Sequence, residues 1–162
     1  MLVAAISDTH LPRGARRLPE ACLERLAAAD LILHAGDVCS VDALDELRAL
    51  GPPVHAVHGN ADAPELRALL PAEFVVDADG VRIGMVHVPG PAAGRERRLL
   101  ARFPGCDAVL FGHTHLPLAE CHEGVWLLNP GSPTERRRAP FRSMLVLSVE
   151  SRRLRPEVVP LA

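Results

Sequence analysis

Residues 2–10 read LVAAISDTH, a short apolar run that leads directly into polar side chains. The length and continuous hydrophobicity of LVAAI predict a buried β-strand, and Asp8 and His10 follow its end. The same arrangement recurs at 30–36, where the apolar run DLILHAG precedes Asp37. An apolar strand that ends in polar side chains is therefore the recurring unit of this chain.

Helical segments separate these strands in the first half of the chain. Strands are predicted at 2–6, 30–36 and 53–59, and helices at 18–29, 41–50 and 63–70. Ser40 is placed to cap the second helix. The β-α-β-α-β order and the continuous apolar strands predict parallel strands joined by crossover helices.

The second half changes character and contains mostly strands. We predict a hairpin at 73–88 around an Asp-Gly turn, a helix at 92–103 and a buried strand at 107–112. Only strands are expected after that, at 117–129 (folded about Glu123-Gly124), 141–150 and 154–160. A parallel half followed by an antiparallel half favours an α/β fold of two mixed sheets packed face to face, with helices outside. No repeat or linker interrupts the chain, so residues 1–162 are predicted to form a single domain.

Composition narrows the class of protein. With 162 residues, 48% of them hydrophobic, the chain can bury a real core and is not disordered. The net charge of −2 gives no electrostatic reason for stable nucleic-acid or membrane binding. The four cysteines are widely spaced and are expected to be small buried residues, not a disulfide set. The apolar N-terminal run is too short for a signal peptide, and no run reaches membrane-spanning length, so a soluble cytoplasmic protein is expected.

His113 and His115 stand two residues apart, just beyond the strand at 107–112. Alternate residues of an extended chain point to the same side, so both imidazoles could reach one site. The same pattern also occurs as two partly exposed histidines bonded to backbone, and the pair alone does not decide between a metal site and this alternative.

Other side chains of ligand type also follow predicted strands. Seven such residues lie at strand ends: Asp8, His10, Asp37, Asn60, His87, His113 and His115. In open α/β sheets, ligands bind beyond the carboxyl ends of the strands. Mixed oxygen and nitrogen donors suit manganese, iron or zinc, and seven are too many for one tetrahedral zinc. They would suit two ions that share a bridging carboxylate.

Each of these residues also has an ordinary alternative. The three oxygen donors lie between a strand and a helix, where N-cap residues are common. His34 and His55 lie within predicted strands and are expected to be core or edge histidines with hydrogen-bond partners. His122 precedes a turn and is expected to be solvated. The whole set of seven favours a metal site more strongly than any one member does.

The ordered motifs resemble a known family. Asp8-x-His10, Gly36-Asp37, Gly59-Asn60, His87 and Gly112-His113-x-His115 look like the motifs of the calcineurin-like metallophosphoesterases. Within that superfamily the chain resembles the small bacterial and archaeal stand-alone phosphodiesterases. The resemblance covers nearly the whole chain and extends to Asn129-Pro130-Gly131-Ser132, which is expected to be a supporting loop beside the metals.

The resemblance implies a four-layer α/β/β/α sandwich with two divalent metal ions at one edge. The favoured metal is Mn²⁺, with iron, zinc and nickel as alternatives. It implies that Asp8, His10 and His115 hold one ion and that Asn60, His87 and His113 hold the other. Asp37 would bridge both, with each of its two oxygens on one ion. A hydroxide that bridges the ions would then attack the phosphorus and expel the alcohol.

Two positions depart from the family pattern. Many relatives carry histidine or cysteine after the Gly-Asn pair, where this chain has Ala61, and many continue H-G-H where this chain reads His87-Val88-Pro89. The usual general acid is therefore missing, and the loop after His87 is predicted to differ. His58 is the nearest candidate acid, with Asp62 as a partner to orient it.

The sequence thus predicts a phosphoesterase that acts on phosphodiesters, with Asp37, Asn60 and His58 as its catalytic residues. Its partner would be a small phosphate ester, and a homo-oligomer is compatible with the sequence. One alternative is a phosphomonoesterase or nucleotide phosphatase at the same site. Another is a non-catalytic protein-binding scaffold, because the small scaffold subunit of retromer resembles this fold.

Overall fold

The computed structural model describes residues 1–162, except for the side chain of Ala15. Its strands form two five-stranded sheets. The first sheet has the order β10-β9-β1-β2-β3. Its strands are β1 (Leu2–Ile6), β2 (Leu31–His34), β3 (Val54–Ala56), β9 (Arg142–Glu150) and β10 (Arg153–Leu161). As predicted, β1, β2 and β3 are parallel, and β9 and β10 complete the sheet as antiparallel neighbours.

The second sheet has the order β4-β5-β6-β8-β7. Its strands are β4 (Glu73–Ala78), β5 (Val81–Val86), β6 (Ala108–Phe111), β7 (Leu118–His122) and β8 (Val125–Asn129). The prediction of an antiparallel second half is wrong for three of them, because β5, β6 and β8 are mutually parallel. Only β4 and β7, at the two edges, run antiparallel. The strands β5 and β6 are parallel because α4 (Arg95–Arg102) forms a crossover connection between them. The strand β8 lies between β6 and the edge strand β7, and it is antiparallel to β7 and parallel to β6.

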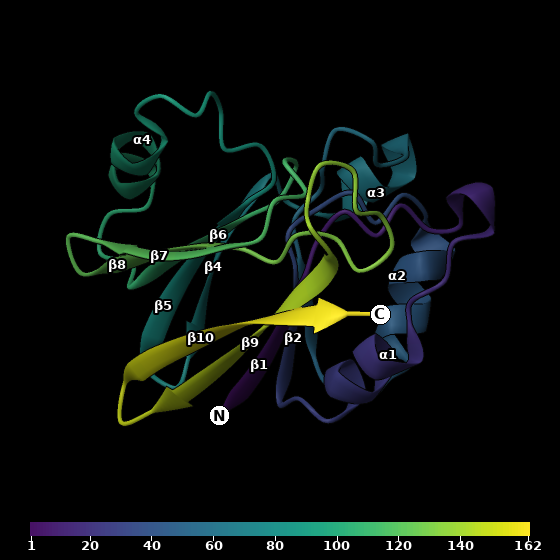
Figure 1. Ribbon diagram of the computed structural model, residues 1–162, viewed down its shortest axis with the longest axis horizontal. Helices are drawn as coiled ribbons and strands as arrows, with labels where there is room; N and C mark the ends of the chain where they lie inside the picture. The colour runs from purple at the N-terminus through teal and green to yellow at the C-terminus, as the bar shows by residue number, and fades with distance from the viewer.

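The helices cover the two outer faces (Figure 1). They are α1 (Glu20–Ala27), α2 (Val41–Arg48), α3 (Pro64–Leu69) and α4, with a short 3-10 turn at Arg13–Ala15. In Figure 1, α1 and α2 lie to the right of the first sheet, and α4 lies at the upper left, beyond the second. The predicted α/β/β/α sandwich is confirmed.

The alternating directions of the β1 side chains explain this layering. Val3 and Ala5 belong to the core between the sheets, together with Ile83 and Met85 of β5. Ala4 and Ile6 point the other way, into the cluster beneath α1 and α2. A strand that is apolar at every position can be buried on both faces, which is why LVAAI has no polar side.

Local sequence signals explain the helix boundaries. Ser40 caps α2 as predicted, and its hydroxyl accepts a hydrogen bond from the amide of Ala43 at 3.2 Å. Pro64 occupies the first turn of α3, where its missing N–H costs nothing. Among the residues described, no helix is long and apolar enough to cross a membrane.

Candidate metal centre

The structure brings all seven predicted side chains to one end of the two sheets. Asp8 and His10 follow β1, Asp37 follows β2, Asn60 lies beyond β3, His87 follows β5, and His113 and His115 follow β6. All five strands contribute their carboxyl ends, because β1 to β3 are parallel in one sheet and β5 and β6 are parallel in the other. Five of the seven side chains are buried, and Asn60 and His113 are exposed at the surface.

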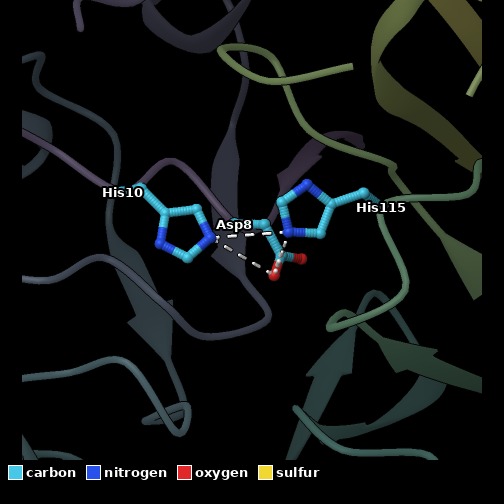
Figure 2. A group of neighbouring side chains, drawn as sticks. All are labelled: Asp8, His10 and His115. Carbon is cyan, nitrogen blue, oxygen red and sulfur yellow. Dashed lines mark hydrogen bonds and ion pairs between the residues drawn. The ribbon is translucent and has the colours of Figure 1, made fainter. Parts of the chain in front are cut away.

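Asp8, His10 and His115 form the first buried group. Figure 2 shows the two imidazoles on either side of the carboxylate. Nε2 of His115 lies 3.2 Å from Oδ1 of Asp8, and Nε2 of His10 lies 3.9 Å from the same oxygen. The two Nε2 atoms are 3.4 Å apart. These donor atoms all lie within 4.8 Å of one another, close enough to hold one ion.

The two oxygens of Asp8 have different surroundings. Oδ2 accepts hydrogen bonds from the hydroxyl of Ser7 at 2.6 Å and from the amide of His113 at 2.9 Å. Oδ1 is buried and has no hydrogen-bond partner among the described residues. A buried carboxylate oxygen without a hydrogen-bond donor costs folding free energy. A cation bound at Oδ1 of Asp8 would remove this cost. The residues therefore fit a bound metal ion.

Asp37 links this group to a second one. Its Oδ2 lies 3.2 Å from Nε2 of His87 and 3.8 Å from Nε2 of His10. Its Oδ1 accepts a hydrogen bond from the amide of Ala61 at 2.7 Å. One oxygen therefore faces both histidines, and the expectation that each oxygen would serve one ion does not fit this geometry. Asp8, Asp37 and His87 also offer donor atoms within 4.8 Å of one another.

Asn60 completes the second group. Its Oδ1 lies 3.1 Å from Nε2 of His87 and 2.9 Å from Nδ1 of His113. An amide oxygen and two imidazole nitrogens are thereby brought together as three possible ligand atoms for a metal ion. The second set expected from the family resemblance is thus assembled, although residues far apart in the chain supply it.

Backbone and side-chain contacts orient the imidazoles. Nδ1 of His87 lies 2.7 Å from the carbonyl oxygen of Ala35 and donates to it, which leaves Nε2 to accept a cation. Nδ1 of His10 lies 3.5 Å from Sγ of Cys39, and Nδ1 of His115 lies 3.5 Å from the carbonyl of Glu135. Sequence reasoning missed Cys39 and Glu135, because only the folded loops bring them to the centre.

The carboxylates of the centre are held in their charged form. Burial opposes ionisation of Asp37, but its contacts with His87 and the Ala61 amide outweigh burial and lower its pKa to about 2. Burial likewise opposes ionisation of Asp8, but the neighbouring His115 and His87 leave its pKa below the usual value. Both side chains are therefore anionic at neutral pH, as metal binding requires.

The imidazoles respond to burial in different ways. Desolvation lowers the pKa of His10 and of His113, which keeps both neutral near pH 7. Burial also disfavours the charged form of His87, but Asp37 and Asp8 raise its pKa overall. A pair of carboxylates that attracts a proton to His87 would attract a divalent cation still more strongly.

The backbone of the centre is strained. Five of the seven residues have positive φ: Asp8 (54°), His10 (48°), Asp37 (60°), His113 (70°) and His115 (59°). Each such conformation costs about 1–3 kcal/mol in a residue other than glycine and persists only where the surroundings enforce it. This concentration of strain at the strand ends marks the functional site.

The glycines of the motifs make room for the neighbouring side chains. A Cβ at Gly59 would lie 2.1 Å from Oδ1 of Asp37, and one at Gly112 would lie 2.0 Å from Oγ of Ser7. Neither position tolerates a side chain. Glycine at positions 59 and 112 therefore leaves the space that the side chains of Asp37, Ser7 and Asp8 occupy.

The loop after β8 supports the histidine pair, as expected. Nδ2 of Asn129 donates to the carbonyl of Gly112 at 3.1 Å and to Oγ1 of Thr114 at 3.0 Å. The hydroxyl of Ser132 donates to the carbonyl of Asp8 at 2.8 Å. Asn129 and Ser132 thus tie the loop to both of the segments that carry the first group.

Several alternative interpretations can now be decided. None of the three oxygen donors caps a helix; the N-cap residues of α1, α2 and α3 are Pro19, Ser40 and Ala63. His34 is a satisfied core histidine, with Nε2 at 3.1 Å from Oγ1 of Thr9. His55 stacks on Phe74.

Two smaller expectations are wrong. Cys121 is exposed, not buried, because β7 is an edge strand. Asp62 does not orient His58: its carboxylate accepts hydrogen bonds from the amides of Asp37, Cys39 and Gly59 at 3.1, 2.6 and 2.6 Å. Asp62 fixes the loop that carries Asp37 instead. His58 itself lines a cavity beside the centre.

Known proteins match this chain in sequence and in fold. Residues 1–152 match the calcineurin-like phosphoesterase superfamily domain. The chain belongs to this superfamily. It is 39% identical to a probable metallophosphoesterase of Methanocaldococcus jannaschii, over 99% of this chain and 82% of the relative.

Solved structures support the same placement of the chain. A Thermotoga maritima protein determined by NMR is 34% identical, with a TM-score of 0.78 over 99% of both chains. A Vps29 variant from Entamoeba histolytica is 25% identical, with a TM-score of 0.79 over the full length of both chains. The fold and the buried Asp/His cluster together identify a metallophosphoesterase architecture.

Proposed function

We propose that this phosphoesterase hydrolyses phosphodiesters at a centre that holds two divalent ions, with Mn²⁺ as the favoured metal. The observation that carries the proposal is the Oδ1 atom of Asp8, which is buried between imidazoles and has no hydrogen-bond partner among the residues that the structure describes. A cation is the natural partner for a buried anionic oxygen that lies among imidazole nitrogens. The donors are carboxylate and amide oxygens and imidazole nitrogens, with no thiolate. Such a set is compatible with manganese, iron or zinc.

The assignment of residues to the two ions follows the two groups. Asp8, His10 and His115 would hold one ion, and Asn60, His87 and His113 the other. Asp37 would contact both through Oδ2, the oxygen that lies near both His10 and His87. Its other oxygen is held by the Ala61 amide, so the carboxylate is fixed in the orientation that bridging needs.

Two bound ions would lower the pKa of a coordinated water and neutralise charge on the phosphate. The side chains of the protein would orient the metal ions and the substrate. Asp37 is anionic and fixed, and it would offset part of the positive charge of the two ions. The amide NH₂ of Asn60 can donate to a phosphoryl oxygen, because Asn60 is exposed and its oxygen already faces His87 and His113.

A cavity beside the centre can receive a substituent of the phosphate ester. It has a volume of about 590 Å³ and shares Asn60 and His87 with the centre. A ligand pocket of this size can take a substituent as large as a nucleoside. A diester carries two substituents on phosphorus, and this cavity gives the larger one a place.

His58 is proposed as the proton donor to the leaving group. It lines the same cavity as Asn60 and is partly exposed. An imidazole there is close to a group that leaves toward the cavity, and a general acid typically accelerates such a step about 10²–10⁴-fold.

The test combines metal content with substrate choice. Protein loaded with Mn²⁺ should hydrolyse bis(4-nitrophenyl) phosphate faster than 4-nitrophenyl phosphate, and chelation should abolish both reactions. A Glu20→Gln variant, on the exposed start of α1, is the control and should match the wild type. A higher rate on the monoester would favour the phosphomonoesterase alternative. Protein that bound no metal and hydrolysed neither ester would favour the scaffold alternative.

A further inference from the structure

The cavity beside the metal centre also carries unneutralised positive charge. Three arginines line it: Arg67, Arg98 and Arg102. Arg102 is paired with the carboxylate of Glu73, to which its Nε donates at 2.7 Å. Within the part of the chain that the structure describes, neither Arg67 nor Arg98 has a carboxylate within 4.0 Å. Two guanidinium charges are therefore available to an anion in this cavity.

Arg98 is held in place by backbone atoms. It donates to the carbonyls of Ala93, Pro89 and Pro91 at 3.1, 3.2 and 2.5 Å. A Cβ at Gly90 would lie 3.0 Å from its Nε, so the guanidinium packs directly on the loop after β5. Since a guanidinium has five N–H donors and the loop engages three, two remain for another acceptor.

Arg67, which also lines the cavity, is anchored in a similar way. Its Nε donates to the carbonyl of Asp62 at 3.2 Å, and its NH2 group donates to the carbonyl of Asn60. Neutral carbonyls fix the guanidinium without cancelling its charge. Arginines that are already fixed lose less conformational entropy when they bind an anion.

The remaining walls of the cavity are mostly apolar. Val86, Val88, Pro89, Pro91 and Leu99 line it together with the arginines. A ligand that fills the cavity therefore meets apolar side chains and the positive charge of the arginines. It also meets Asn60 and His87 of the centre.

We propose that the substrate carries a second anionic group, such as a phosphate, on the substituent that occupies this cavity. Arg98 and Arg67 bind that group while the centre holds the reacting phosphate. The inference rests on the proposed function, because it takes the centre as the place of the first phosphate. A polyanionic ester, such as a nucleotide with phosphates at two positions, has the required chemistry.

A matched pair of substrates tests the second anion. Thymidine 5′-(4-nitrophenyl phosphate) and its 3′-phosphorylated form differ only in the second phosphate and release the same nitrophenolate. Wild-type protein with Mn²⁺ should show a lower KM for the phosphorylated form. Arg98→Gln should raise that KM about tenfold or more, the loss expected for a hydrogen bond to a charged group. It should leave the other substrate nearly unchanged.

The control is Arg97→Gln, one position away on α4 and outside this cavity. It removes one positive charge from the same helix and should not change the ratio of the two KM values. An equal loss on both substrates in Arg98→Gln would mean that Arg98 only supports the loop, and it would overturn the proposal.

Binding gives a readout that does not depend on turnover. Calorimetry should show that metal-loaded wild-type protein binds thymidine 3′,5′-bisphosphate more tightly than thymidine 5′-phosphate, and that Arg98→Gln removes the difference. If this preference appears without hydrolysis of either ester, the second-anion site stands and the proposed function fails. If both esters are hydrolysed equally and both nucleotides bind equally, the proposed function stands and the second-anion site fails.

Discussion

Oδ1 of Asp8 lies 3.2 Å from Nε2 of His115 but has no hydrogen-bond partner in the described part of the chain. The side chain is fully buried, and its other oxygen is held by Ser7 and by the His113 amide. The carboxylate therefore cannot turn to relieve Oδ1. In the metal-free protein this arrangement costs stability, and a bound cation would remove the cost.

Metal binding should therefore stabilise the fold. A ligand that binds only the folded state, at a free concentration of about 100 times its Kd, adds about 2.7 kcal/mol to the free energy of unfolding. Thermal unfolding should show a higher Tm with Mn²⁺ than with a chelator, and the difference should grow with metal concentration. Asp8→Asn should remove most of this gain. A Tm that is identical with and without metal would contradict the proposed centre.

Asp37→Asn and His115→Ala should affect the two ions differently. The Asp37 variant loses an oxygen that lies near both groups, so both ions should be held more weakly and turnover should fall by about 10² or more. The His115 variant loses a donor from the first group and should lose mainly one ion. Metal analysis of the two purified proteins compares them, with circular dichroism to show that both are folded. Two retained ions and near-normal turnover in Asp37→Asn would exclude bridging by this residue.

The leaving group should control the rate. Ala61 takes the place of the usual acid, and His58 has no carboxylate to orient it, since Asp62 is bonded to backbone amides. Because an acid that no carboxylate holds in place protonates the leaving group inefficiently, the rate should still fall from aryl to alkyl phosphodiesters as the leaving-group pKa rises, and it should fall more steeply in His58→Ala. A series of such esters at fixed pH and metal concentration measures the slope.

The contribution of His58 appears in the same series. If His58 is the acid, His58→Ala should slow alkyl esters more than nitrophenyl esters, because nitrophenolate leaves without a proton. His55→Ala is the matched control, since His55 stacks on Phe74 and does not line the cavity. Equal slowing of all esters by His58→Ala would assign His58 a role other than proton donor.

Much of the fold follows from the sequence because burial leaves a local pattern. In β1, Val3 and Ala5 face the core between the sheets, while Ala4 and Ile6 face the helices, and LVAAI is apolar at all of these positions. The direction of β8 was not predictable in this way. An apolar strand is equally buried in either direction, and only pairing with β6, which is distant in the chain, decides it.

The site was predictable to the extent that motifs place side chains at strand ends. Asp37 and His87 are recognisable because each follows an apolar strand. Cys39 beside His10, and Asp62 beneath Asp37, were missed or misassigned because their contacts depend on loop conformation. The positive φ of Cys39 (89°) could not be predicted, because only glycine signals such a conformation in a sequence.

His34 should make stability depend on pH in the weakly acidic range. Burial lowers its pKa from 6.5 to about 4 in the folded protein. Between these values the unfolded chain binds a proton that the folded chain does not, so stability falls as pH falls, by up to about 1.4 kcal/mol per pH unit. Denaturant unfolding of metal-free protein at several pH values measures this slope. His34→Asn should be less stable at pH 7 and should lose that part of the slope. An unchanged slope in the variant would show that other groups cause the pH dependence.

The positions of the bound metal ions test the central claim most directly. Crystals grown with Mn²⁺ and measured near the manganese absorption edge should give two anomalous peaks, about 3.5–4 Å apart. One peak should lie among Asp8, His10 and His115, and the other among Asn60, His87 and His113, with Oδ2 of Asp37 in contact with both. A single peak, or none at this end of the sheets at saturating Mn²⁺, would contradict a binuclear centre.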